Sequence, residues 1–353
     1  MKKGLLLCYL LAANLLIWAQ AGGRYTNEFL NLKLSPVISA LQGANIAQLS
    51  ADPSVLVRNP ALLNEKMKNR LNVSYNNYIK DINFGNLGYV FEIKGQAIHA
   101  GMLYINYGQF DGYDETGQST GKFSVNNYAF YTGTAKKLTD RLTLGGNFKF
   151  IYNQSESYFS SGMALDAGLH YKDSSGNTNM GFVIRNAGVT LKNYTKNIKE
   201  GMPLNIEFSY SKKLEHTPFR FNLLLHNLQQ LDMRYVRRDG ASQNTSLDAS
   251  ALPKKISIGD NALRHLSLGT ELLLGEFTHL RLGYNHQMRR ELSPENRKKL
   301  TGFAWGFGIE LYKIHVNYAS SAFFPGITTN QFSIVFNIAT IYTKKSNINK
   351  SEQ

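Results

Sequence analysis

Apolar and polar residues alternate with a period of two over most of the chain after residue 70. Leu280, Leu282 and Tyr284, for example, alternate with Arg281 and Gly283. Successive side chains of a β-strand point to opposite faces, so this pattern indicates strands with one apolar and one polar face. We count about 14 such segments, centred near residues 75, 89, 102, 129, 147, 167, 182, 208, 222, 268, 282, 307, 316 and 334.

The connections between these segments alternate in length. Those expected at one end are short, at 94–96, 139–141, 173–177, 214–218, 275–276 and near 311–312. Those expected at the other end are longer, at 108–122, 154–161, 188–202, 228–262, 287–301 and 321–328. Outer-membrane barrels have short periplasmic turns and long outer loops. A soluble sandwich would show similar alternation, but it has no reason to gather its long loops at one end. The pattern predicts an all-β fold, a transmembrane antiparallel β-barrel of about 14 strands.

The first residues are typical of an export signal. Lys2 and Lys3 precede an apolar stretch at 4–18, and Ala19-Gln20-Ala21 fits a cleavage site, so residues 1–21 are predicted to be a signal peptide. A short buried helix is the alternative. The only cysteine, Cys8, lies inside this signal, which excludes disulfides and thiolate metal sites from the exported chain.

Residues 22–69 differ from the rest of the chain, because they contain three prolines and little alternation. Ser35 and Pro36 are typical of the N-cap and first position of a helix. We expect 22–69 to form an N-terminal element packed against a larger body at 70–340, which is the predicted outer-membrane β-barrel, and 341–353 to form a polar C-terminal tail.

No local pattern indicates catalysis. The eight histidines show no i, i+2 or i, i+4 pair, so we interpret them as solvated lumen or loop residues without a metal site. The lone Gly306-Phe307-Gly308 lies within an alternating segment, where tight packing or a bend is the better interpretation. No G-x-S-x-G motif occurs. We expect no enzymatic activity and no cofactor.

Positive charge is concentrated in two predicted long loops, and the whole chain has a formal net charge of +14. The clusters are Arg234, Arg237 and Arg238, and Arg289, Arg290, Arg297, Lys298 and Lys299. Nucleic acid is disfavoured as a partner because the chain is predicted to be exported. Solvated loop charge is one interpretation, and contact with the phosphates of lipopolysaccharide is the other.

Several segments resemble those of a known family. Leu41-Gln42-Gly43-Ala44-Asn45, Ala51-Asp52-Pro53 and Arg58-Asn59-Pro60-Ala61-Leu62-Leu63 resemble the hatch of FadL-like outer-membrane barrels. Closer still, the chain resembles the PorQ family of the type IX secretion system of Bacteroidota, from about residue 27 to residue 340. The further matching stretches are 29–32, 106–110 with Asp114-Glu115, 158–166, 185–188 and 216–220. Gln42 departs from the family, which usually has a second glycine there.

The resemblance implies a 14-stranded barrel with an N-terminal hatch or plug segment at 22–69, which carries the structural motif Asn59, Pro60 and Ala61. It also implies a non-enzymatic subunit of the cell-surface complex that processes secreted cargo and anchors it to anionic lipopolysaccharide in the outer membrane. The implied partners are a PorU-like peptidase, a PorV-like barrel and a PorZ-like protein, together with outer-membrane lipids.

The alternative function is a FadL-like transporter of hydrophobic small molecules. A transporter needs an apolar pocket near its hatch. The expected inner faces instead carry charged side chains, at Lys149, Asp166, His170, Glu207, Arg220 and Arg281. We interpret these residues as poorly suited to a lipid path.

Overall fold

The computed structural model describes residues 25–195, 201–233, 257–275, 277–293, 300–311 and 314–339. The predicted signal at 1–21 and the polar tail at 341–353 lie outside these residues. No helix in the described part of the chain has the length and apolar character needed to cross a membrane.

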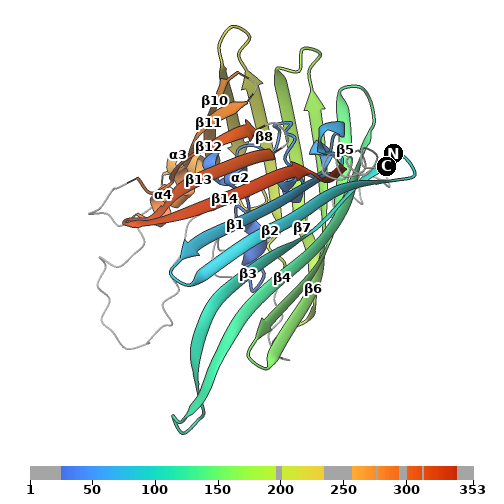
Figure 1. Ribbon diagram of the computed structural model, residues 1–353. Helices are drawn as coiled ribbons and strands as arrows, with labels where there is room; N and C mark the ends of the chain where they lie inside the picture. The colour runs from blue at the N-terminus through green and yellow to red at the C-terminus, as the bar shows by residue number, and fades with distance from the viewer. Residues whose placement is uncertain are drawn as a thin grey trace, which may run out of the picture.

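The described strands close into one antiparallel barrel in which each strand pairs with its sequence neighbours and β1 pairs with β14 (Figure 1). This confirms the predicted fold class and the number of strands. The bounds are β1 Arg70–Ile79, β2 Ile82–Ile93, β3 Gln96–Tyr113, β4 Ser119–Lys137, β5 Leu142–Ser155, β6 Tyr158–Lys172, β7 Thr178–Lys192, β8 Asn205–Lys213, β9 Phe219–Leu225, β10 Leu266–Leu274, β11 Thr278–Asn285, β12 Phe303–Leu311, β13 Ile314–Phe324 and β14 Ile327–Asn337.

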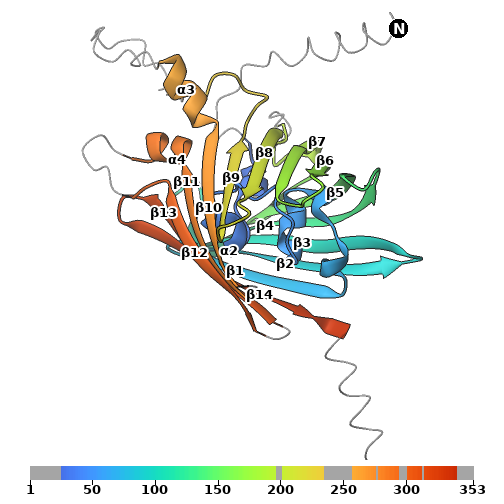
Figure 2. The ribbon, with the colours of Figure 1, turned by 90° about the horizontal axis from the view of Figure 1, so that it is seen from above.

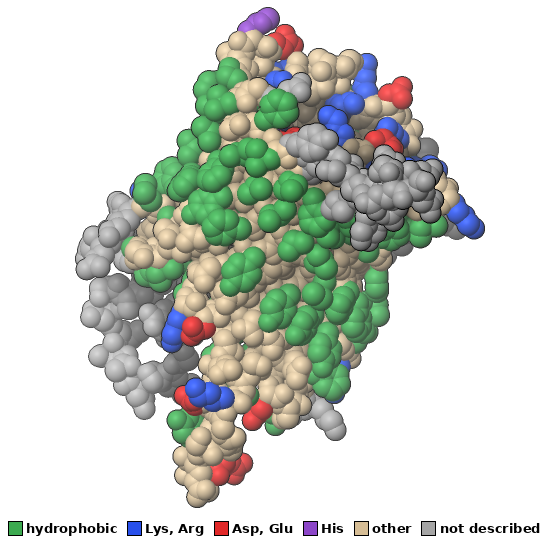
Figure 3. All heavy atoms as spheres, in the orientation of Figure 1, with side chains coloured by type: hydrophobic (Ala, Val, Ile, Leu, Met, Phe, Trp, Pro, Cys, Tyr) green, Lys and Arg blue, Asp and Glu red, His purple; other side chains and the backbone are tan. Residues whose placement is uncertain are grey.

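The apolar face of the strands points outward. Leu282 is 64% exposed and Ile334 is 47% exposed, whereas polar inner-face residues such as Asn72 and Ser333 are buried. Figure 3 shows apolar side chains spread over the visible outer wall. A closed barrel satisfies every strand edge internally, which a sheet in lipid requires. The outward apolar face is therefore the surface expected of a membrane-spanning barrel.

The long connections all lie at one end of the barrel, which we call the loop end. They span 193–204, 226–265 and 286–302, and the last two contain the helices α3 (Ile258–Arg264) and α4 (His286–Glu291). The expectation of long loops at 154–161 and 321–328 is wrong, because the strands continue to tight turns at 156–157 and 325–326.

The expected loop at 108–122 is also mostly strand. β3 and β4 continue as a hairpin that reaches the bottom of Figure 1, and only 114–118 connect them. Beyond the apolar wall both faces of a strand are solvated, so the apolar–polar contrast that identifies a strand disappears there.

The segment from residue 25 to residue 69 lies within the ring of strands (Figure 2). It is built of short helical turns: η1 Glu28–Asn31, α2 Pro36–Ala40, η2 Pro53–Val57, η3 Pro60–Leu62 and η4 Glu65–Met67. Ser35 caps α2 by accepting a hydrogen bond from the Ile38 amide, as its sequence predicts. Asp52, Asn59 and Asn64 cap the following turns in the same way. We call this segment the hatch.

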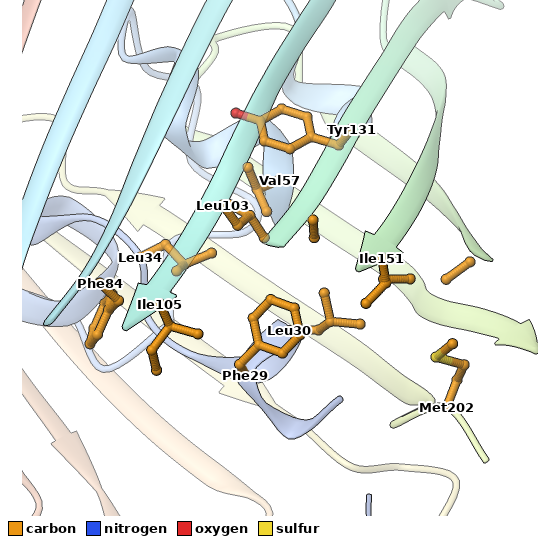
Figure 4. Close-up of a cluster of buried hydrophobic side chains, with 12 residues drawn as sticks. Phe29, Leu30, Leu34, Val57, Phe84, Leu103, Ile105, Tyr131, Ile151 and Met202 are labelled. Carbon is orange, nitrogen blue, oxygen red and sulfur yellow. The ribbon is translucent and has the colours of Figure 1, made fainter. Parts of the chain in front are cut away.

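The hydrophobic core lies between the hatch and the barrel wall. Figure 4 shows Phe29 and Leu30 of the hatch directed toward Ile105 and Ile151 of the wall. A second cluster joins the η2–η3 region of the hatch to Val90 of β2. Burial of these apolar side chains holds the hatch inside the barrel.

Candidate functional site

Asn59, Pro60 and Ala61 form the turn that seats the hatch against β5 and β6. The Asn59 side-chain oxygen accepts a hydrogen bond from the Ala61 amide (3.0 Å), and its amide group donates to the Ile46 carbonyl (2.8 Å). Pro60 restricts Asn59 to an extended conformation, which suits this cap. One asparagine thus joins two hatch segments and satisfies a buried backbone group on each.

Glycines in the wall make room for this turn. A Cβ at Gly145 of β5 would overlap backbone atoms of Pro60 and Ala61, and one at Gly168 of β6 would overlap the Asn59 side chain. On the far side of the lumen, a Cβ at Gly306 would lie 2.7 Å from the Ala40 Cβ. Gly306 of the lone G-x-G at 306–308 therefore serves close packing of the hatch, whereas Gly308 makes room for the Asn317 and Arg281 side chains of the wall.

Glu207 on β8 binds the hatch through a buried ion pair. Its carboxylate accepts hydrogen bonds from Nη2 of Arg58 at 2.8 and 2.9 Å, and Arg185 of β7 approaches within 3.7 Å. Arg185 also donates to Asn31 of the hatch (2.7 Å). All three charged side chains are buried. We call this arrangement the Glu207 clamp.

A second buried carboxylate, Glu271 of β10, contacts another part of the hatch. It accepts hydrogen bonds from Gln48 (2.8 Å), Arg220 (2.7 Å) and Arg281 (2.8 Å). The inner charges noted in the sequence therefore bind the hatch or each other instead of lining an aqueous lumen.

The interpretation of all histidines as solvated is wrong for the inner wall. His99 is buried against Asn147 (2.7 Å), and His170 is buried against the Ala47 carbonyl of the hatch (3.1 Å). Lys149 and Asp166 form an ion pair at 2.7 Å with no exposed side-chain surface. The described residues include no group of three or more His, Cys, Asp or Glu side chains that could hold a metal ion.

A pocket with a volume of about 470 Å³ lies at the loop end, between the wall and the start of the hatch. A bulge in β3 builds it. Asn106 pairs with Asn126 and Gln109 with Ser124, so Tyr107 and Gly108 together lie opposite Val125. Residues three apart in a regular strand face opposite sides, but this extra residue lets both Tyr107 and Phe110 line the pocket.

Gly108 is required at this bulge for two reasons. Its φ is +90°, a conformation that other residues rarely adopt, and a Cβ there would lie 2.9 Å from the Asp81 Cβ. The Asn106 side chain holds the bulge by accepting a hydrogen bond from the Gly108 amide (3.0 Å). The pocket therefore depends on a single glycine in its wall.

The pocket lining is mainly aromatic and apolar, with several uncharged polar groups. The lining residues are Thr26, Tyr107, Phe110, Val125, Asn127, Ser155, Tyr158, Tyr194 and Thr195. Phe110 stacks on Phe123 with ring centres 5.7 Å apart, which stiffens the wall. A concave apolar surface with a few polar groups is the usual form of a small-molecule site.

The basic loop residues are only partly within the described chain. Arg290 of α4 pairs with Asp260 of α3 at 2.8 Å, and Arg289 lies over the Phe303 ring at 5.7 Å. Arg234, Arg237, Arg238, Arg297, Lys298 and Lys299 lie outside the described residues.

Asp260 joins the two loop-end helices. Partial burial acts to raise the pKa of its carboxyl, but hydrogen bonds from His286 and Arg264 and the charge of Arg290 outweigh burial and lower the pKa. Asp260 therefore remains ionised at neutral pH and offsets the positive charge expected there.

Comparison with known proteins gives structural neighbours only. No family model matches the chain, and no curated protein matches it by sequence. The fold resembles a TodX deltaS2S3 mutant monoaromatic hydrocarbon channel, with a TM-score of 0.52 and 11% identity over 86% of this chain and 99% of that one. The chain shares the fold of this channel.

Two further neighbours are of the same kind. The Pseudomonas putida toluene transporter TodX has a TM-score of 0.48 and 13% identity over 87% of this chain and 99% of its own. A Pseudomonas aeruginosa FadL homologue has a TM-score of 0.45 and 8% identity over 86% of this chain and 98% of its own.

Proposed function

We propose that this chain is a non-enzymatic outer-membrane barrel that binds a hydrophobic small molecule in its loop-end pocket, as a FadL-like transporter would. The observation that carries the proposal is the bulge at Tyr107-Gly108, which directs two aromatic rings into an apolar pocket beside the hatch. The fold shared with a hydrocarbon channel supports this function but does not establish it. The apolar outer wall and the predicted export signal support an outer-membrane location, with the loop end at the cell surface.

Binding at this pocket and passage across the membrane are separate steps. Glu207 and Glu271 hold the hatch inside the barrel through buried contacts with Arg58 and Gln48. None of these four residues lines the pocket, so a ligand can occupy the pocket without disturbing the contacts, whereas a path through the lumen past the hatch would need them to open. The proposal therefore concerns binding first, and transport follows only if the Glu207 clamp opens.

Photolabelling with an alkyl-diazirine hydrocarbon tests the pocket. In lipid nanodiscs we expect saturable labelling of inner-face residues between Tyr107 and Asn127, separate from the non-saturable labelling of the lipid-facing wall. Gly108→Val should abolish the saturable fraction, because valine cannot take the bulge conformation. Gly146→Val is the control, since a Cβ there meets only one atom, at 3.7 Å. Equal labelling in both variants would contradict the proposal.

A second candidate is a subunit of the type IX secretion attachment complex. The sequence resemblance from about residue 27 to residue 340 favours it, and so does the buried ion pair that fixes the hatch to the wall, which suits a barrel that supports partners instead of conducting a solute. The partners would be a PorU-like peptidase, a PorV-like barrel and a PorZ-like protein. The basic loops would contact anionic lipopolysaccharide.

Copurification from native membranes separates the two candidates. Recovery of a peptidase and a second barrel with the tagged protein would favour the secretion complex. Saturable labelling without such partners would favour the transporter. Lipopolysaccharide retention should fall with rising salt if the basic loops hold it, because exposed charges are screened.

A further inference from the structure

The end of the barrel opposite the loop end, which we call the turn end, carries an arc of positive charge. Its members lie at or beside the short β4–β5, β6–β7 and β8–β9 turns, and they are Lys136, Lys137, Arg141, Lys172, Lys212 and Lys213. We call these six residues the basic arc. In Figure 3 several Lys and Arg side chains stand at the upper, turn end of the molecule, beyond the apolar outer wall.

Carboxylates of the same three turns do not pair with the basic arc. Asp173 accepts a hydrogen bond from the Thr178 amide, and Glu215 accepts one from Asn177, so both are held within the turns. Among the described residues, no ion pair joins a member of the basic arc to any carboxylate. The charge of the basic arc is therefore available to a partner outside the chain.

Part of the basic arc lies on the outer face of the wall. Phe130 of β4 faces outward, and Lys136 lies six positions further along the same strand, so both side chains point to the same side. Lys212 of β8 likewise lies opposite the buried face that Glu207 presents, and it donates a hydrogen bond to Thr178 of β7 (2.9 Å). These cations thus continue the lipid-facing surface at its rim.

Tyrosines mark the edge of the lipid just inside this rim. Tyr171 of β6 pairs in register with Met180 of β7, which pairs with Tyr210 of β8, so the three side chains form a row across the outer face. Tyrosine is enriched where apolar lipid meets headgroups. The row ends one or two residues from Lys172 and Lys212. The basic arc therefore lies at the level of the lipid headgroups.

Headgroups of different charge would not contact the basic arc equally. A lysine or arginine at such a rim packs its aliphatic stem on apolar surface and extends its charge toward the phosphates. Every phospholipid phosphate accepts charge-assisted hydrogen bonds, but a zwitterionic lipid also brings a cation of its own. The unpaired positive charge of the basic arc consequently favours a headgroup with net negative charge.

We propose that the basic arc selects anionic phospholipids, with phosphatidylglycerol as the model, over zwitterionic ones in the leaflet at the turn end. The inference goes beyond ligand binding in the pocket, and it rests on the membrane location that forms part of the proposed function. It assigns a lipid contact to the end of the barrel opposite the basic loops.

Fluorescence quenching by brominated phospholipids tests the selection at a chosen point of the wall. The sequence has two tryptophans, Trp18 in the predicted signal and Trp305 on β12. In a Trp305→Phe background, Tyr171→Trp places a single reporter beside the basic arc of the exported chain. Tyr128→Trp, on the half of β4 nearer the loop end, is the control position. Nanodiscs would contain phosphatidylglycerol and phosphatidylcholine, with bromine on the acyl chains of one or the other.

At Tyr171→Trp we expect phosphatidylglycerol to associate about fivefold more strongly than phosphatidylcholine, as one cation near an anionic headgroup allows. At Tyr128→Trp the two lipids should quench about equally. High salt should lower the ratio at Tyr171→Trp toward one, because exposed charges are screened.

Two charge-matched variants assign the ratio to the basic arc. The first neutralises the three exposed cations of the β4–β5 hairpin, by Lys136→Gln, Lys137→Gln and Arg141→Gln together, and should bring the ratio at Tyr171→Trp close to one. The second changes the net charge equally but near the loop end, by Lys80→Gln, Lys122→Gln and Lys192→Gln together, and should leave the ratio unchanged. All six positions lie on the surface, so both variants should fold.

A ratio near one at Tyr171→Trp in the chain with an intact basic arc would overturn the inference. A ratio that survives the first variant, or that falls equally in the second, would overturn it as well, because the charge of the arc would then not be its cause. The same holds if Tyr128→Trp shows an equal preference. Absence of quenching by either lipid at both reporters would instead overturn the membrane location itself.

Discussion

Replacing Glu207 with glutamine is expected to destabilise the folded protein by about 3–5 kcal/mol, because it removes the counter-charge of two buried guanidinium groups. Glu207 is 1% exposed and binds Arg58 of the hatch at 2.8 Å, with Arg185 at 3.7 Å. Glutamine retains the shape but not the charge. We expect the free energy of unfolding in urea, measured in detergent micelles, to fall by this amount.

The hatch should loosen before the barrel does, because Arg58 belongs to the hatch whereas Glu207 belongs to the wall. The only cysteine of the sequence is Cys8, so a single engineered cysteine reports on one position once Cys8 is replaced. Ser54→Cys is suitable, since Ser54 is fully buried in η2. Maleimide labelling of this residue should accelerate in the Glu207→Gln background.

A surface ion pair supplies the matched control. Lys68 and Glu92 form a salt bridge whose side chains are 43% and 35% exposed. Exposed pairs contribute about 0–1 kcal/mol, so Glu92→Gln should leave both unfolding and Ser54→Cys labelling nearly unchanged. Similar effects from the two glutamine variants would mean that the Glu207 clamp does not hold the hatch.

The barrel could be predicted from the sequence because its signal is local. Each strand shows its own alternation, as at Leu280, Leu282 and Tyr284, and the apolar face is determined by lipid contact alone. The ends of the strands were harder to predict from the sequence. β5 continues to Ser155 and β6 begins at Tyr158, although the sequence between residues 154 and 161 shows no period-two contrast.

The contacts that hold the hatch could not be predicted, because they join residues far apart in the chain. Arg58 and Glu207 are separated by 149 positions, and no local spacing marks them as partners. From the sequence, the charged inner-face residues could be interpreted only as poorly suited to a lipid path. The structure shows that Arg58 and Glu207 are buried and paired with each other.

The bulge that forms the pocket could have been recognised from the sequence. Tyr107 and Phe110 flank Gly108 within a strand, and two aromatic residues three apart can share a face only if the strand contains a bulge. The resemblance marked the stretch 106–110 without assigning it a role. A glycine between aromatic residues in an otherwise regular strand is therefore worth testing as a bulge in related sequences.

Gly145→Val is expected to have the largest effect on the position of the hatch. The valine side chain would occupy the space of the Pro60 and Ala61 backbone, and backbone atoms cannot turn aside as a flexible side chain can. Either the turn leaves the wall or the wall bends, and overpacking of this kind costs about 1–3 kcal/mol or more. We expect the closed barrel to form and the hatch to lose its contact with β5, so that maleimide labels Ser54→Cys rapidly.

Gly146→Val is the control, because it lies on the same strand and its Cβ would make only an ordinary contact with the Asp166 carbonyl oxygen, at 3.7 Å. Valine favours strand conformation, so Gly146→Val should fold with unchanged or slightly higher stability and leave Ser54→Cys protected. A difference between two adjacent glycines of β5 can arise only from the face that each presents. If Gly145→Val left the labelling rate of Ser54→Cys unchanged, the hatch would not be seated on the inner glycines, and the function of the Asn59-Pro60-Ala61 turn would have to be sought elsewhere.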